Sequence, residues 1–166
     1  MGESSIEREE RKKRLEELLR ERKKKEEKIE SERRIADMLE LFPDKDKVEI
    51  LCEKESNKVE TKLTDSFPIA WYGRIDWGKL NNKIVIPNEE IQNIPYILLQ
   101  QGLENISPVY LIVGLYGYPV VKTSISTILD NIEEIMCMGP DQYIYCPLSK
   151  YVIEFFHDDV ITVGWL

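Results

Sequence analysis

The chain has 166 residues, of which 42% are hydrophobic, and this is enough apolar material for one folded domain with an appendage. Its 23 basic and 31 acidic residues give a net charge of -8. No stretch approaches the roughly 18 consecutive apolar residues of a membrane span, and the charged N-terminus lacks the apolar core of a secretory signal. These properties argue against a membrane-spanning or secreted class, and we expect a cytoplasmic protein with no membrane partner.

The charge is unevenly divided between two regions of the chain. Residues 1–42 hold 13 basic and 13 acidic side chains, whereas residues 43–166 hold 10 basic and 18 acidic ones, so the whole imbalance belongs to the second region. We interpret residues 1–42 as a long charged helix, an arm or extension, and residues 43–166 as a single domain. An acidic domain repels phosphate backbones, so we expect no direct binding of nucleic acid. It suits a basic protein partner, although solubility alone would also account for it.

Residues 4–42 contain neither Gly nor Pro, which predicts one long helix that ends before Pro43. Ser4 and Glu7 have the spacing of a capping box. In six pairs a glutamate precedes a basic residue by four positions, the better orientation for a solvated helix: Glu7/Arg11, Glu9/Lys13, Glu10/Arg14, Glu16/Arg20, Glu21/Lys25 and Glu30/Arg34. The heptad positions are only partly apolar, so a stable homodimeric coiled coil is not expected and the oligomeric state stays open.

An apolar stripe near the end of this helix predicts its attachment to the domain. The stripe consists of Ile35, Met38, Leu39 and Phe42, which recur at helical spacings. We therefore expect the helix to be solvated up to about Ser31 and the stripe to pack against the domain.

Residues 48–101 predict a hairpin, an irregular segment, a strand and a helix. Residues 48–53 and 58–63 have the composition of two strands joined by a polar turn. Residues 67–77 are aromatic and irregular, and residues 83–86 form a short strand. A helix is predicted over residues 89–101, with Asn88 as its N-cap and Gly102 as its stop.

Residues 109–166 predict five strands and one helix. A nearly uncharged strand at 109–115 is expected inside the sheet, and a turn joins it to a strand at 120–122. Ser124 caps a helix over residues 125–138, and the last strands cover 143–146, 151–156 and 160–165. The fold class is therefore α+β: a mostly antiparallel sheet with two packed helices, preceded by the long charged N-terminal helix.

The register of the final hairpin follows from its two polar residues, Glu154 and Thr162. A three-residue loop over 157–159 pairs Phe156 with Val160 and sets Glu154 opposite Thr162 on one face. A two-residue turn would place them on opposite faces. We predict the three-residue loop and an interior position for the last strand.

The sequence shows no convergent set of catalytic, metal-binding or cofactor-binding residues. Cys52, Cys137 and Cys146 are widely spaced and lack the clustered partners that zinc needs, and the last two are expected to be buried free thiols. The single histidine, His157, precedes two aspartates and is better explained as part of a polar turn. The glycines of residues 114–119 fit no phosphate-binding pattern.

The irregular segment at 67–77 concentrates the residue types that are enriched at binding hot spots. It combines aromatic, basic and acidic side chains, namely Phe67, Trp71, Tyr72, Arg74, Asp76 and Trp77. Trp71 and Trp77 either close one end of the core or anchor a partner, and the sequence leaves both interpretations open.

Six strings in the second region, taken together, resemble a group of small bacterial immunity proteins of contact-dependent growth inhibition and related polymorphic toxin systems. The strings follow one another over residues 67–166: Gly73-Arg-Ile-Asp-Trp77, Ile84-Val-Ile-Pro-Asn-Glu-Glu90, Pro108-Val-Tyr-Leu-Ile112, Tyr118-Pro-Val-Val-Lys-Thr123, Tyr143-Ile-Tyr-Cys-Pro147 and Tyr151-Val-Ile-Glu-Phe-Phe-His157. The long helix at 1–42 lies outside the resemblance.

The resemblance implies a cytoplasmic inhibitor, not an enzyme, that binds the C-terminal domain of one cognate toxin and blocks it. Such toxins are often nucleases, whose substrate-binding face is basic, and carboxylates of the inhibitor would replace phosphates or cover the active-site mouth. Our hypothesised contacts are acidic residues at helix starts and loops, with two tryptophans as anchors: Trp71, Asp76, Trp77, Glu89, Glu90, Asp141, Asp158 and Asp159.

Two other interpretations stay open at this point. A non-catalytic adaptor module of another small α+β family, similar to the SUKH type, would differ in its partner rather than in its fold. An unrecognised small enzyme would need a deep polar pocket that holds His157 or a cysteine.

Overall fold

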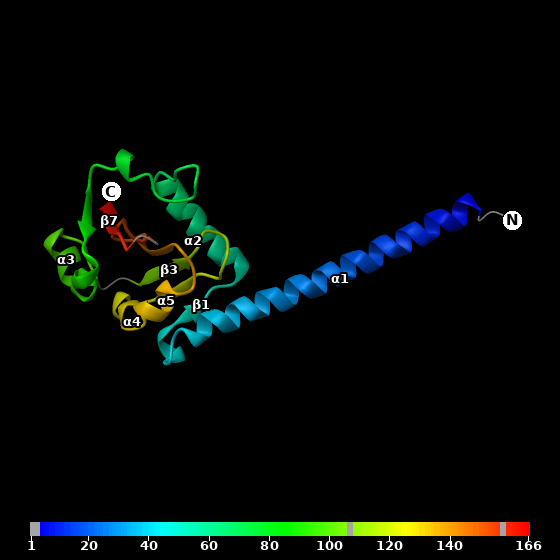
Figure 1. The fold of residues 1–166 in the computed structure, drawn as a ribbon, viewed down its shortest axis with the longest axis horizontal. Helices are drawn as coiled ribbons and strands as arrows, with labels where there is room; N and C mark the ends of the chain where they lie inside the picture. The colour runs from blue at the N-terminus through cyan, green and yellow to red at the C-terminus, as the bar shows by residue number, and fades with distance from the viewer. Residues whose placement is uncertain (1–3, 106–107, 157–158) are drawn as a thin grey trace. The chain divides into compact units, whose positions relative to one another are not determined.

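The computed structural model describes residues 4–105, 108–156 and 159–166. The chain divides into two compact units, Met1–Ala36 and Asp37–Leu166. Figure 1 labels some of the helices and strands, and each unit is described by itself below.

The N-terminal helix α1 spans Ser5–Glu40 without interruption (Figure 1). Its capping box is confirmed: the Ser4 amide donates to Glu7 Oε2 at 2.9 Å, and the Glu7 amide donates to Ser4 Oγ at 3.3 Å. The predicted pair of Glu30 and Arg34 is present at 3.2 Å. Most side chains of the helix are exposed, so it is a solvated, salt-bridged helix as the charge pattern predicts.

Asp37–Leu166 begins with the end of α1, where the predicted stripe meets the core. Met38 and Phe42 are 0% and 1% exposed and belong to the larger hydrophobic cluster, together with Leu41. The packing predicted for these two residues is confirmed, whereas Ile35 is 38% exposed.

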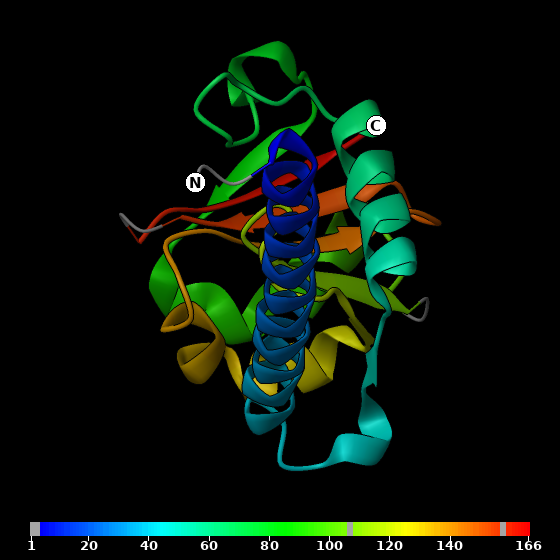
Figure 2. The same cartoon turned by 90° about the vertical axis from the view of Figure 1, so that its right-hand side faces the viewer.

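The sheet has seven strands in the order β1-β4-β3-β5-β6-β7-β2, and every neighbouring pair is antiparallel. The strands are β1 (Glu49–Ile50), β2 (Lys83–Ile86), β3 (Val109–Val113), β4 (Val121–Thr123), β5 (Gln142–Cys146), β6 (Tyr151–Phe155) and β7 (Ile161–Trp165). The predicted α+β class and the interior positions of β3 and β7 are confirmed. Figure 2 shows the orange and red strands side by side, with the teal helix α2 lying across them.

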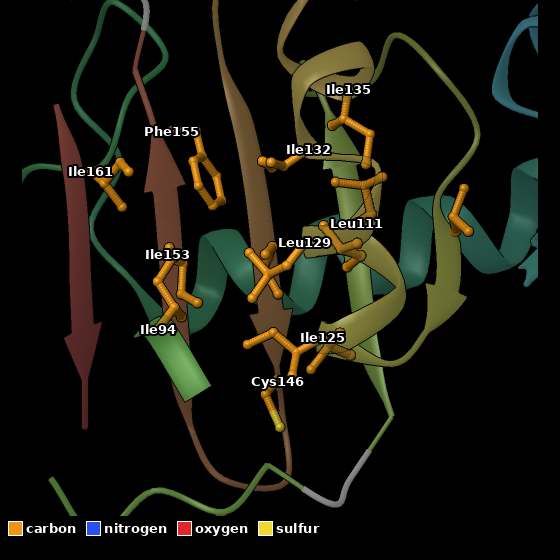
Figure 3. Close-up of a cluster of buried hydrophobic side chains, with 14 of the residues drawn as sticks. Ile94, Leu111, Ile125, Leu129, Ile132, Ile135, Cys146, Ile153, Phe155 and Ile161 are labelled. Atoms are coloured by element: carbon orange, nitrogen blue, oxygen red, sulfur yellow. The ribbon is translucent and has the colours of Figure 1, made fainter. Parts of the chain in front are cut away.

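Helices cover both faces of this sheet. The α-helices are α2 (Glu53–Ser66), α3 (Ile94–Gln100), α4 (Ile125–Asp130) and α5 (Ile132–Met136), and the 3₁₀ helices are η1 (Lys45–Lys47), η2 (Trp77–Lys79) and η3 (Asn88–Asn93). Residues of α3, α4 and α5 pack with one face of the strands in the larger cluster. Figure 3 shows Ile125, Leu129 and Ile132 against Ile153 and Phe155, with α2 passing behind the strands.

The opposite face holds a smaller cluster and the irregular segment. Leu63 of α2, Phe67 and Ile75 pack there against Tyr143 and Val152 of the sheet. The two helices predicted from the sequence both pack on the first face. The prediction missed α2, which packs on the opposite face.

The hairpin predicted over residues 48–63 is wrong, because most of this segment is helix α2. The buried residues of α2 are Ser56, Glu60 and Leu63, at helical spacings of four and three. Residues 59, 61 and 63 alternate in a way that also fits a strand, and this short alternation misled the prediction. The Ser56 hydroxyl accepts the Val120 amide at 3.0 Å, which fixes α2 to the start of β4.

Both predicted helices of the later chain are broken. Pro95 cannot donate a helical hydrogen bond, and residues 88–100 divide into η3 and α3 near it. The N-cap of η3 is Pro87, so the assignment of Asn88 as a cap is wrong. Asn131 separates α4 from α5 and donates its side-chain amide to the Thr127 carbonyl at 2.9 Å.

Several local predictions are confirmed. The Ser124 hydroxyl accepts the Thr127 amide at 3.2 Å and so caps α4. Gly102 has a φ of 74° at the end of α3, where glycine is the natural stop. Glu154 pairs with Thr162 in the final hairpin, and the Phe156 amide donates to the Val160 carbonyl at 3.0 Å, as the three-residue loop predicts.

The cysteine prediction holds for one residue and fails for another. Cys146 is buried in the larger cluster, next to the side chains labelled in Figure 3. Cys137 is exposed because it follows the last turn of α5, outside the face that packs on the sheet.

Candidate functional site

The carboxylate of Glu154 accepts four hydrogen bonds. This residue lies next to the last position of β6, opposite Tyr143 of β5 and Thr162 of β7, and its side chain is 0% exposed. Its Oε1 accepts from Arg74 Nε at 3.1 Å, from Arg74 Nη2 at 2.8 Å and from Trp77 Nε1 at 3.0 Å. Its Oε2 accepts from the Ile75 amide at 3.1 Å. A buried carboxylate is tolerated only when its oxygens are satisfied in this way.

Arg74 completes the site from the irregular segment. Its side chain is 20% exposed, and its guanidinium carbon lies 3.7 Å from the centroid of the Phe156 ring. The guanidinium is therefore held by a charge-assisted pair on one side and by an aromatic face on the other. These contacts fasten residues 74–77 to strand β6 and to the residue that follows it.

The segment directly before these anchors is a tight turn, residues 70–73, which we call the aromatic turn. Ile69 bridges to Ile75, the Ala70 amide donates to the Arg74 carbonyl at 2.7 Å, and the Gly73 amide donates to the Ala70 carbonyl at 2.9 Å. Gly73 has a φ of 86°, a conformation that favours glycine. The turn therefore has a defined backbone geometry.

The sheet supports the turn from below through Tyr143. The Tyr143 hydroxyl donates to the Gly73 carbonyl at 3.1 Å. Burial raises the pKa of this phenol, and the nearby charges of Glu154 and Asp141 raise it further. The hydroxyl thus stays a donor to the Gly73 carbonyl.

Trp71 and Tyr72 occupy the tip of the aromatic turn. Trp71 is 94% exposed and Tyr72 is 60% exposed, and their rings meet edge to face at 5.3 Å. The interpretation of Trp71 as a core residue is therefore wrong, because the bonds of residues 70–75 hold its side chain away from the core.

Trp77 has the opposite environment. It is partly buried against the smaller cluster, and its indole N–H donates to Glu154. Its ring lies so close to Gly164 of β7 that an added Cβ there would be 2.5 Å away. Trp77 therefore helps to close the core, and a contact of this residue with a partner stays a prediction.

The predicted acidic contacts fall mainly at one end of the sheet. One row of paired residues crosses five strands and marks one end of the sheet: Val113, Gln142, Phe155, Ile161 and Ile86. We call this end, with the acidic residues next to the row, the acidic end. Asp141 directly precedes the row, Asp159 lies two residues before Ile161 with a φ of 62°, and Glu89 and Glu90 open η3 beyond Ile86.

The remaining predicted contacts are divided. Asp76, which directly precedes Trp77, is partly buried and forms an ion pair with Lys79 at 3.5 Å. Asp158 lies outside the described residues, as does His157. The structure thus brings Glu89, Glu90, Asp141 and Asp159 to one end of the sheet, whereas Asp76 is paired with Lys79 at the start of η2.

A second buried carboxylate, Glu60 of α2, was missed by the sequence analysis. It is 1% exposed, and its Oε2 accepts the Tyr116 amide at 3.0 Å, whereas its Oε1 has no hydrogen-bond partner among the described residues. Burial raises the pKa of Glu60 to about 7, and the bond from Tyr116 lowers it in part. The assignment of residues 58–63 to a strand concealed this residue.

No group of three or more His, Cys, Asp or Glu side chains that could hold a metal ion occurs within residues 4–105, 108–156 and 159–166. In the same part of the chain, no helix is both long and apolar enough to cross a membrane. Every interaction shown for Arg74 and Glu154 fastens a segment to the sheet.

These features define a class: a small α+β protein in which buried polar side chains hold an exposed turn on the sheet. The comparison with known families gives the particular identity. A family model described as "CdiI immunity protein EcoliA0-like" matches residues 44–164, and the chain belongs to this family. No curated protein matches the chain. The resemblance to immunity proteins is confirmed, and it extends further toward the N-terminus than residue 67.

Membership of this family defines the biological role. The protein is an immunity protein that neutralises a cognate toxin, and its partner is therefore a toxin protein.

Proposed function

We propose that this immunity protein blocks a nuclease by covering the basic substrate-binding surface of the toxin's C-terminal domain with its own acidic end. The observation that supports this is the charge distribution: the net charge of -8 belongs entirely to residues 43–166. Four exposed or partly exposed carboxylates stand near one row of the sheet, from Glu89, Glu90, Asp141 and Asp159.

The physical basis is electrostatic complementarity. A nuclease binds phosphates with Lys and Arg, so a cluster of carboxylates is attracted to the same surface and competes with the substrate. Arg74 also lies at this end, but its charge is offset by Glu154 at 2.8 Å. On this proposal the protein acts in the cytoplasm, where the toxin meets nucleic acid, and it inhibits by binding without a catalytic step of its own.

The first experiment is co-expression with the C-terminal domain encoded by the reading frame directly upstream. We expect cells to survive only when both proteins are present, and the two proteins to co-purify. A harmless upstream product that does not bind would contradict the assignment of this partner and would favour an adaptor role.

The second experiment tests the acidic end with a matched pair of double variants. Glu89→Ala/Glu90→Ala removes two carboxylates from the first turn of η3, and Glu53→Ala/Glu55→Ala removes two from the first turn of α2. We expect the first variant to slow association with the toxin by roughly tenfold at low salt, and high salt to reduce the difference. Equal effects of both variants would show that only net charge matters.

A further inference from the structure

The aromatic turn presents apolar rings to solvent at high exposure. Trp71, at 94%, is the most exposed of the large hydrophobic side chains that the structure describes, and Tyr72 beside it is exposed at 60%. Single exposed apolar residues are common on proteins. Two adjoining rings on one turn form a compact patch of the residue types that dominate binding energy.

The turn is also held rigidly, which an ordinary exposed loop is not. Six hydrogen bonds fix its two sides. The Ala70 and Gly73 amides bond within the turn, the Tyr143 hydroxyl holds the Gly73 carbonyl, and Glu154 accepts two bonds from Arg74 and one from the Ile75 amide. A flexible turn would let Trp71 fold back onto the apolar surface. A fixed turn keeps the rings outside and lowers the entropy lost when a partner binds them.

The surroundings of the turn select the chemistry of the partner. Asp141 lies two residues before Tyr143, whose hydroxyl donates to the Gly73 carbonyl. Asp159 donates its amide to the carbonyl of Phe156, whose ring lies under Arg74. A partner must therefore offer an apolar pocket surrounded by basic groups. A second copy of this chain would bring one acidic end against another.

We infer that Trp71 and Tyr72 insert into an apolar pocket within the basic surface of the cognate toxin domain, and that Arg74 and Glu154 are positioning residues that hold the two rings for insertion. The inference rests on the proposed function, because it names the anchor within that acidic interface. Trp71 and Tyr72 supply contact energy, whereas Glu154 acts only through the turn.

The test measures the affinity of the purified full-length protein for the purified toxin domain. We expect Trp71→Ala to weaken binding by about 30-fold or more, mainly through faster dissociation, and Tyr72→Ala to have a smaller effect in the same direction. The matched control is Leu148→Ala: Leu148 is 72% exposed and lies beyond the pairing of Cys146 with Tyr151, at the opposite end of the sheet. This control is expected to bind as the unmodified protein does.

The positioning role is tested by combining substitutions. Glu154→Gln keeps the shape of the side chain but weakens its hold on Arg74, and we expect it to weaken binding as well. If Glu154 acts only by holding the two rings, adding Glu154→Gln to Trp71→Ala/Tyr72→Ala should weaken binding no further. Thermal unfolding of each variant checks that it is folded, and Arg74→Lys provides a second perturbation of the same pair.

The outcomes separate the two proposals. If the unmodified protein does not bind the toxin domain, the proposed function fails. If it binds, but Trp71→Ala and Tyr72→Ala bind as tightly as Leu148→Ala, the aromatic anchor is wrong and the acidic interface stands. If Glu154→Gln weakens binding as much in Trp71→Ala/Tyr72→Ala as in the unmodified protein, Glu154 is not a positioning residue.

Discussion

Two buried glutamates each fasten a loop of this protein, but they differ in how many hydrogen-bond donors surround the carboxylate. Glu154 and Glu60 are 0% and 1% exposed, and each accepts a backbone amide from a distant segment, Ile75 in one case and Tyr116 in the other. Glu154 has three further donors, two of them from a guanidinium. Glu60 has one bonded oxygen and one that is without a partner among the described residues.

The comparison shows that burial alone does not determine what a carboxylate contributes. The donors around Glu154 replace the water that it loses, so the bonds to Arg74 and Ile75 hold the aromatic turn as a charged clamp. Burial of Glu60 is compensated only in part, which is why its pKa rises to about 7. Four donors therefore hold the first segment, whereas one amide bond to a partly compensated carboxyl holds the second.

The largest expected effect is that of Glu154→Ala. The substitution leaves the Arg74 guanidinium, the Trp77 indole N–H and the Ile75 amide without their acceptor in a buried place. We expect a loss of about 3–5 kcal/mol in the free energy of unfolding, as for breaking a buried ion pair from one side. Urea denaturation measures it. A loss below about 1 kcal/mol would show that the clamp is not a major source of stability.

A smaller effect, of opposite sign, is expected for Glu60→Gln. In the unfolded chain this carboxyl has its ordinary pKa of 4.5, and in the folded chain its pKa is about 7. Because the folded state binds the proton more tightly, this group lowers the stability as the pH rises from 4.5 to about 7, and the full penalty persists above that range. A glutamine can still accept the Tyr116 amide and carries no charge.

The measurement for Glu60 is the free energy of unfolding of both proteins at about pH 5 and about pH 8. We expect the free energy of unfolding of Glu60→Gln, relative to that of the unmodified protein, to rise from about pH 5 to about pH 8 by at most about 3 kcal/mol. A difference between the two proteins that does not change with pH would contradict the raised pKa. Glu53→Gln, at an exposed position of the same helix, serves as the control.

The same contrast explains what the sequence could and could not predict. The pairing of Glu154 with Thr162 was predictable, because two polar residues in otherwise apolar strands and a short loop fix the register locally. The bond from Arg74 to Glu154 joins residues 80 positions apart, and no local pattern marks it. Glu60 was hidden because a short alternation in residues 58–63 fits a strand as well as a helix.

The aromatic turn shows the same limit at the candidate site. Composition marked Trp71 and Trp77 as equivalent tryptophans of one irregular segment, and it left core and interface open for both. Their environments differ because Glu154 binds the Trp77 indole N–H, whereas the bonds at Gly73 and Arg74 direct the tip outward. Which tryptophan is buried depends on contacts with β5 and β6, and these appear only when the chain is folded.

The smallest expected effect in this comparison is that of Tyr143→Phe. The substitution removes the hydroxyl that donates to the Gly73 carbonyl at 3.1 Å and leaves the ring in the smaller cluster. The expected loss of stability is about 1 kcal/mol, measured by urea denaturation, because only one neutral hydrogen bond is lost and Glu154 still holds Arg74 and Ile75. A loss equal to that of Glu154→Ala would contradict this comparison. It would show that the Tyr143 hydroxyl holds the aromatic turn as strongly as the Glu154 carboxylate does.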